Sequence, residues 1–439
     1  QRALMLWRLA EHQSRTGVDP GPALDGALAA ARTAARCDPS SEAAWVNLGM
    51  TWWRRAEAVQ ARGGDSGPAL EEAIGALQRA VSLNPGSADA RTDLALAYWT
   101  RGEAEQEEGK DPRPQLREAL RQLEEVNRLH PRLATPYADR GGICLEYGTW
   151  EVNHGQDPSA IYGQGAESCR KAIALNPNLP AAHQYLANLL LRQGSYLQQV
   201  NRDPRPVFEE ARVEYRRAIE LNPRYAAAYT NLGGVCQRLA YQDLFEGRDP
   251  TANLQEAVGC FRQAQAANPA SHLAFANEGV AQNLAARYQM DQGRDPTEAV
   301  RQARVALARA RSINANRSSL WREMAETELV AARWAASAGG RPEPLFTEAE
   351  RLAGESLRLN PDSADAFLCR AQVRRHRTMW ERGRGRAVEP WIRNGIEDAG
   401  RAFAIDPEQF EALAVRGALR LLRAQSEKDP ARAREAARE

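Results

Sequence analysis

The segment Trp45-Val-Asn-Leu-Gly-Met-Thr-Trp52 carries the pattern that decides the fold. Its bulky residues and Gly49 fall at i, i+3, i+4 and i+7, which places them on one face of an α-helix. The position of Gly49 holds a small residue at every later interval of 46 residues: Ala95, Gly141, Ala187, Gly233, Gly279, Ala325, Ala371 and Gly417. A position kept small along the chain predicts close contact between packed helices.

Two further markers keep the same interval of 46 residues. A proline, most often after asparagine, recurs at Pro39, Pro85, Pro131, Pro177, Pro223, Pro269, Pro361 and Pro407, and Ala315 fills the gap in the series. An aspartate, most often before proline, recurs at Asp19, Asp65, Asp111, Asp157, Asp203, Asp249 and Asp295. Two independent markers with one period indicate an internal repeat with no insertion or deletion.

The markers predict the local structure of one repeat. Gly109 can adopt the left-handed conformation that ends a helix. Asp111 can then accept a hydrogen bond from the first free N–H groups of the next helix, and Pro112 fits that first turn. Asn84-Pro85 ends the second helix, because a residue before proline avoids the helical region. Each repeat is therefore predicted as a first helix (helix A), a capped turn and a second helix (helix B).

This arrangement resembles the tetratricopeptide repeat (TPR). The aromatic–x–x–Leu–Gly–x–x–aromatic run from Trp45 to Trp52 is similar to its first helix, and Ala73, Ala80 and Pro85 are similar to its second. A standard TPR has ~34 residues, so this one is longer, and the added residues fall between helix A and helix B. The resemblance implies an all-α fold, a TPR-like α-solenoid that forms a right-handed superhelix of about nine helix-turn-helix repeats.

We expect one solenoid over residues 1–439. The markers divide it into a partial repeat 1–39, full repeats 40–85, 86–131, 132–177, 178–223, 224–269, 270–315, 316–361 and 362–407, and a partial repeat 408–439. The chain is expected to enter within a helix A and to leave in a helix B. It begins at Gln1 and not at methionine, which indicates a piece of a longer protein.

Composition excludes several classes of protein. Lys and Arg number 58 against 57 Asp and Glu, a net charge of +1, so no global attraction to nucleic acid or membrane is expected. No apolar stretch reaches the length of a membrane helix. The six scattered cysteines predict reduced packing residues of a cytoplasmic protein. Neither cysteines nor histidines have metal-ligand spacing, and we predict no catalytic, cofactor-binding or metal-binding residue.

The predicted binding surface is the side of helix A that faces away from helix B, since this side lines the concave surface of such solenoids. Helical spacing assigns to it the candidate groove residues Val46, Met50, Trp53, Thr92, Leu96, Trp99, Gln184, Asn188, Thr230, Gln237, Arg322, Gln372 and Arg375. Trp53 and Trp99 are the best candidates for anchoring a peptide. The alternative is that both tryptophans cover neighbouring helices.

A second candidate is a cluster of arginines near the C-terminus. The candidate basic patch comprises Arg370, Arg374, Arg377, Arg382, Arg384 and Arg386, with Glu381 as the one acidic residue between them. It predicts either a solvated helix end, a docking site for an acidic or phosphorylated segment, or attraction between copies through the acidic run Glu103–Glu108. Nucleic acid is the least favoured partner, because no series of aromatic residues accompanies the arginines.

The turns Gly247-Arg-Asp-Pro250 and Gly293-Arg-Asp-Pro296 also resemble those in the repeat arms of eukaryotic-like serine/threonine protein kinases of GC-rich bacteria. No kinase catalytic motif occurs in this chain. The function expected from the resemblance is a protein–protein interaction scaffold that holds a peptide or partner protein, as the regulatory or docking arm of such a kinase. The alternatives are a self-assembling structural solenoid and a free-standing adaptor.

Overall fold

The computed structural model describes residues 2–15 and 19–426. Within these residues the chain forms 19 α-helices joined by turns, and no strand. The predicted all-α fold, a TPR-like α-solenoid of successive helix pairs, is confirmed. Contacts divide the chain into an N-terminal half, Gln1–Asn222, and a C-terminal half, Pro223–Glu439, and each half is described by itself.

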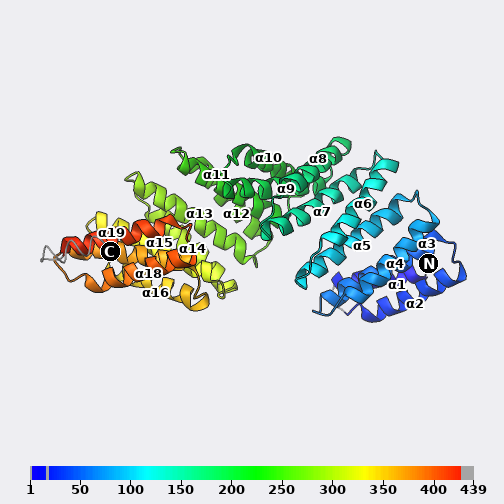
Figure 1. Cartoon of the computed structure of the whole chain (residues 1–439), viewed down its shortest axis with the longest axis horizontal. Coiled ribbons are helices and arrows are strands. Elements are labelled where there is room, and N and C mark those ends of the chain that lie inside the picture. The colour runs from blue at the N-terminus through cyan, green and yellow to red at the C-terminus, as the bar shows by residue number, and fades with distance from the viewer. Residues whose placement is uncertain (1, 16–18, 427–439) are drawn as a thin grey trace. The chain divides into compact units, whose positions relative to one another are not determined.

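The N-terminal half contains five helix pairs. Its helices are α1 (Arg2–Arg15), α2 (Gly21–Cys37), α3 (Glu42–Gln60), α4 (Gly67–Leu83), α5 (Ala88–Glu107), α6 (Arg113–Leu129), α7 (Ala134–Asn153), α8 (Ser159–Leu175), α9 (Pro180–Gln199) and α10 (Arg205–Leu221). Odd-numbered helices are helices A and even-numbered ones are helices B. Figure 1 shows the pairing, with α3 lying along α4 and α5 along α6.

The C-terminal half contains four pairs and one further helix A. Its helices are α11 (Ala226–Phe245), α12 (Thr251–Ala267), α13 (His272–Asp291), α14 (Thr297–Ile313), α15 (Ser318–Ser337), α16 (Glu343–Leu359), α17 (Ala364–Arg382), α18 (Glu389–Ile405) and α19 (Phe410–Ser426). The helix B expected after α19 lies outside the described residues.

The turn between helix A and helix B forms as its markers predict. The carboxylate of Asp111 accepts a hydrogen bond from the backbone N–H of Arg113, 3.0 Å away, and all seven marker aspartates make the equivalent bond two residues on. Gly109 has a φ of +75°, and the same repeat position has a positive φ from Gly63 to Gly385. Asn201 occupies this position in one repeat, with a φ of 53°.

Small residues allow helices A and B to pack closely at two levels. A Cβ atom added at Gly233 would lie 2.6 Å from Cε1 of Phe261, which is closer than real contacts allow. The second level lies in the extension of helix A, where a Cβ at Gly148 would overlap the ring of Tyr162. Tyr162 is 1% exposed. The elongated helices therefore continue to pack beyond the length of a standard repeat.

Within each half, most successive helices A contact one another, as α7 does α9 and α13 does α15. Among the described residues, successive helices B make no comparable contact. Helices A therefore form one side of each half, and helices B form the other. We call the surface made by the side chains of helices A that point away from helices B the helix A face.

Candidate functional site

The helix A face of the C-terminal half contains a hollow of about 430 Å³. Side chains of five successive helices A and of the turn before α19 line it: Tyr241, Val280, Asn283, Leu284, Arg287, Arg322, Glu323, Glu326, Asp365, Leu368, Cys369, Gln372, Gln409 and Glu411. Two of the predicted groove residues, Arg322 and Gln372, lie in this wall. Glu323 and Arg287 also line the hollow but were not predicted: Glu323 lies next to the predicted row, and Arg287 lies one helical turn beyond the last predicted position of a repeat.

Charged groups meet in the wall of this hollow. Arg322 donates a hydrogen bond to Oε1 of Glu323, 2.5 Å away, and it also pairs with Glu326. The Glu323 side chain is only 12% exposed. Burial and the neighbouring charge of Glu326 raise the pKa of Glu323, and the Arg322 guanidinium opposes this increase. The hollow is thus a polar site in which one arginine holds two carboxylates.

A second recess of about 200 Å³ adjoins the hollow and shares Arg287, Glu326, Gln372 and Glu411 with it. Its remaining lining is Leu329, Val330, Arg333, Arg375 and His376. We call Arg287, Arg333 and Arg375 the arginine trio. Burial together with the charges of Arg333 and Arg375 lowers the pKa of His376 to about 3. The imidazole is therefore neutral at physiological pH, so the positive charge here belongs to the trio.

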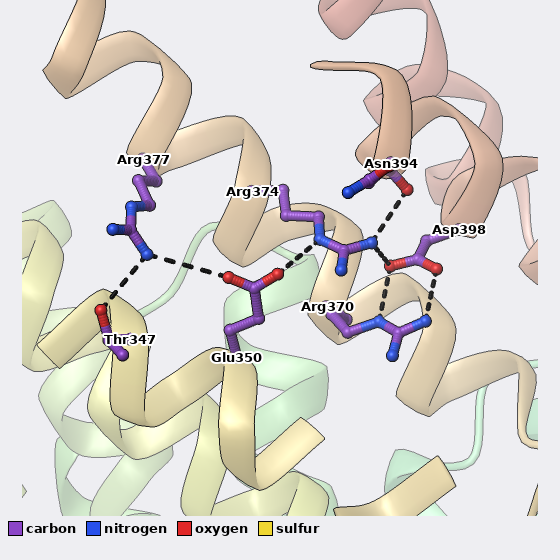
Figure 2. A network of polar contacts seen from close by, with 7 residues as sticks. All are labelled: Thr347, Glu350, Arg370, Arg374, Arg377, Asn394 and Asp398. Atoms are coloured by element: carbon purple, nitrogen blue, oxygen red, sulfur yellow. Dashed lines mark hydrogen bonds and ion pairs between the residues drawn. The ribbon is translucent and has the colours of Figure 1, made fainter. Parts of the chain in front are cut away.

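The candidate basic patch requires a correction, because its charges are largely neutralised within the fold (Figure 2). Arg370 donates two hydrogen bonds to Asp398, both 2.7 Å. Arg374 donates one hydrogen bond to Asp398, at 2.6 Å, and another to Glu350, at 2.8 Å. Arg377 bonds to Thr347 at 3.3 Å and lies 3.8 Å from Glu350. These carboxylates come from α16 and α18, so the three arginines hold neighbouring helices together.

The rest of the patch is also engaged. Arg386 pairs with the buried Glu381 at 2.9 Å, and Arg382 donates to Gln425 at 2.6 Å. The guanidinium of Arg384 lies 3.9 Å from the ring centre of Trp380. Four of the six arginines therefore pair with carboxylates, whereas the partners of Arg382 and Arg384 are neutral.

Carboxylates occupy the helix A face of the N-terminal half. Burial raises the pKa of Asp139 to about 6, and burial with the charge of Asp89 raises that of Asp93 to about 6. Burial together with the charge of Glu146 raises the pKa of Glu103 to about 7. This face is therefore rich in carboxylates that are costly to ionise.

Among curated proteins, none matches this sequence significantly. A family model described as TPR repeat matches residues 208–239, which cover most of α10 and the first part of α11. This match agrees with two features described above, the sequence period of 46 residues and the pairing of successive helices. The chain folds as a TPR-like α-solenoid, and residues 208–239 match the TPR repeat model.

Solved structures similar to part of the array include three proteins. One is a tetratricopeptide repeat protein from Parabacteroides merdae, with 14% identity, 74% of this chain and 99% of that chain covered, and a TM-score of 0.39. Another is pilF from Pseudomonas aeruginosa, with 16% identity, 63% and 97% coverage and a TM-score of 0.39. The third is YrrB, a TPR protein with an unusual peptide-binding site, with 21% identity, 57% and 98% coverage and a TM-score of 0.33.

Trp53 and Trp99 of the TPR array contact neighbouring helices A. The Trp53 indole donates a hydrogen bond to Thr100 of α5, 3.1 Å away. Trp99 packs on α7, where a Cβ added at Gly142 would lie 2.5 Å from Cη2 of the indole. Its ring centre also lies 6.2 Å from that of Tyr185 in α9. These contacts agree with the alternative in which both tryptophans cover adjacent repeats.

The other predicted groove residues are divided between the two halves. Val46, Met50, Thr92, Leu96, Gln184, Thr230 and Gln237 are half-buried on helices A. Asn188 accepts a hydrogen bond from the Tyr215 hydroxyl at 2.5 Å, and so serves the fold. Arg375 lies in the second recess, apart from the N-terminal candidates.

The described residues offer neither a metal site nor a membrane-spanning helix. No group of three or more His, Cys, Asp or Glu side chains there is placed to hold a metal ion. None of the described helices combines the length and the apolar character needed to cross a membrane. Cys37 is exposed, and the other five cysteines are buried.

Proposed function

We propose that this TPR array is a protein-interaction scaffold that holds an extended peptide segment along the helix A face of its C-terminal half. The observation that carries the proposal is the hollow of about 430 Å³ that side chains of successive repeats line together. A segment lying across successive helices A can contact several repeats at once. The polar wall offers Asn283, Gln372 and Gln409 as hydrogen-bonding partners for its backbone.

A display library of random dodecapeptides, screened against the folded 439-residue chain, tests this proposal. Gln372→Trp fills the hollow, and Gln255→Trp places the same side chain on an exposed position of α12 as the matched control. We expect selected peptides to bind the wild type and Gln255→Trp equally, and to lose at least tenfold in affinity with Gln372→Trp. Failure to select any peptide, or equal binding by both variants, contradicts the proposal.

The finer proposal is that the array is the regulatory or docking arm of a bacterial serine/threonine protein kinase. Its support is the style of the Gly-Arg-Asp-Pro turns, which also serve the fold, since Asp249 and Asp295 cap the helices that follow. Sequencing the source DNA upstream of Gln1 tests it. A kinase catalytic domain in the same open reading frame supports the docking arm, and a nearby start codon leaves a free-standing adaptor.

Self-assembly remains the structural alternative to peptide binding. Light scattering over a dilution series separates the two functions. A mass that falls to that of one chain on dilution supports association between copies, whereas a single-chain mass at every concentration eliminates it.

A further inference from the structure

We propose that the arginine trio (Arg287, Arg333 and Arg375) binds an oxyanion carried by a side chain of the partner peptide, a carboxylate or a phosphoryl group. This inference rests on the proposed function, because the recess adjoins the hollow in which the peptide is placed. The arginine trio is distinct from the candidate basic patch that was predicted from the sequence.

Three successive repeats build the recess. Arg287 and Arg333 occupy the same repeat position on α13 and α15, and Arg375 lies one helical turn earlier in its own repeat on α17. Leu329 and Val330 form an apolar part of the wall. Charges beside an apolar wall are poorly screened, so the positive potential of three guanidinium groups is concentrated there.

The acidic groups around the recess do not neutralise the trio. Within the described residues, neither Arg287 nor Arg375 lies within 4.0 Å of a carboxylate, and Arg333 reaches Asp291 only at 3.7 Å. Of the carboxylates that line the recess, Glu326 pairs with Arg322, and Glu411 accepts a hydrogen bond from Gln372 at 2.7 Å. This differs from Arg370 and Arg374, which are both satisfied by Asp398.

A second observation points to a ligand. The Nε atom of Arg375 is buried and has no hydrogen-bond partner. An unsatisfied buried donor costs free energy, and a donor on a charged group costs more than a neutral one. Burial and the charges of Arg287 and Arg375 also lower the pKa of Arg333, although Asp291 opposes this decrease. A bound oxyanion supplies both the missing acceptor and the missing negative charge.

Two display libraries test the inference, a full random library and a matched library that lacks Asp and Glu. We expect the full library to give binders that the acid-free library does not. Selected binders are then synthesised with the acidic residue as Glu, as phosphoserine and as Gln. Because a hydrogen bond to a charged group contributes about 1.5–3 kcal/mol, the Gln peptide should bind at least tenfold more weakly. Tighter binding of phosphoserine than of Glu identifies a phosphoryl group as the source, and the reverse identifies a carboxylate.

Variants of the trio link this chemistry to the recess. Arg287→Gln, Arg333→Gln and Arg375→Gln should each lower the affinity for the acidic peptide about tenfold and leave that for the Gln peptide unchanged. Arg375→Lys keeps the charge and should recover part of the loss. Arg401→Gln removes an arginine that is 62% exposed on α18, and should change neither affinity. Circular dichroism verifies that each variant folds.

The outcomes separate this inference from the proposed function. If acid-free peptides bind the hollow as tightly as acidic ones, the oxyanion site is disproved and the peptide-binding function stands. Acidic peptides that bind all trio variants with unchanged affinity also disprove the oxyanion site. If neither library yields a peptide that depends on Gln372, both proposals fail.

Discussion

One repeat position carries opposite charges in the two halves of the array. Glu103 of α5 in the N-terminal half corresponds by the 46-residue period to Arg287 of α13 and Arg333 of α15 in the C-terminal half. Burial raises the pKa values of Glu103 and its neighbour Glu146, whereas the ion pair nearest to the arginines joins Arg333 to Asp291 at 3.7 Å. The difference shows that positions packed between helices A and B set the fold, and that positions on the helix A face are free to vary in chemistry.

The largest expected effect is at a packing position, where both halves should respond alike. Gly148→Val forces a side chain into the ring of Tyr162, and Gly233→Val does the same at Phe261. Each should lower the free energy of unfolding by about 3 kcal/mol, since overpacking strains a close-packed interior. Urea unfolding followed by circular dichroism measures this. Gly163→Ala is the control, because nothing lies within 4 Å of the added Cβ, and it should stabilise by about 0.5 kcal/mol.

The next effect concerns the ion pairs that distinguish structural arginines from the trio. Asp398→Ala leaves Arg370 and Arg374 without their shared carboxylate, which is 4% exposed. Breaking a buried pair should cost about 3 kcal/mol. Glu397→Ala is the matched control on the same helix, since its pair with Arg401 is 62% exposed on both sides and should contribute less than about 0.5 kcal/mol. Equal losses in the two variants contradict the assignment of Asp398 to a structural role.

A third comparison uses one repeat position that holds Trp99 in the N-terminal half and Gln237 in the C-terminal half. Trp99→Ala should cost about 2 kcal/mol, because it removes the contact with Gly142. Gln237→Ala should change stability by less than about 0.5 kcal/mol. Thermal unfolding measures both. If Trp99→Ala leaves the melting temperature unchanged, Trp99 does not stabilise the N-terminal half and is available to a partner.

The smallest effect is a pH dependence of stability that arises from Asp139, on the helix A face of the N-terminal half. Because the pKa of Asp139 is raised from 3.8 to about 6, the folded state holds this proton more tightly than the unfolded state does. Its contribution to stability is therefore complete below pH 4 and is lost as the pH rises to about 6. Asp139→Asn should remove this dependence and stabilise by about 1 kcal/mol at pH 7. Asp25→Asn, at a carboxylate 63% exposed, should show neither change.

The sequence predicts the local structure well, because each local signal acts over a few residues. Gly109 and Asp111 specify their turn without reference to any distant residue, and the small position at Gly233 predicts the close approach that Phe261 fills. Because the sequence pattern recurs every 46 residues, the same turn and the same helix contact recur along the chain. Sequence alone therefore suffices for the all-α fold and the helix pairs.

The surface charge could not be predicted from the sequence, because residues far apart in the chain neutralise one another in the fold. Arg374 meets Glu350 and Asp398, both 24 residues away on different helices, so its charge is neutralised by groups that the local sequence does not show. Conversely, Arg287 and Arg333 stand alone in the sequence and come together only when successive helices A pack side by side. A search for like charges one period apart on one row could have found this pair.

The contacts between helices have a mechanical consequence. Within each half, the described helices pack substantially only against helices one or two places away in the chain. A stretching force applied to the two ends therefore passes through every repeat in series, with no long-range contact to share the load. Under tension, each half should unfold in a succession of small steps. When the force is released, it should refold from any helix pair that is still folded.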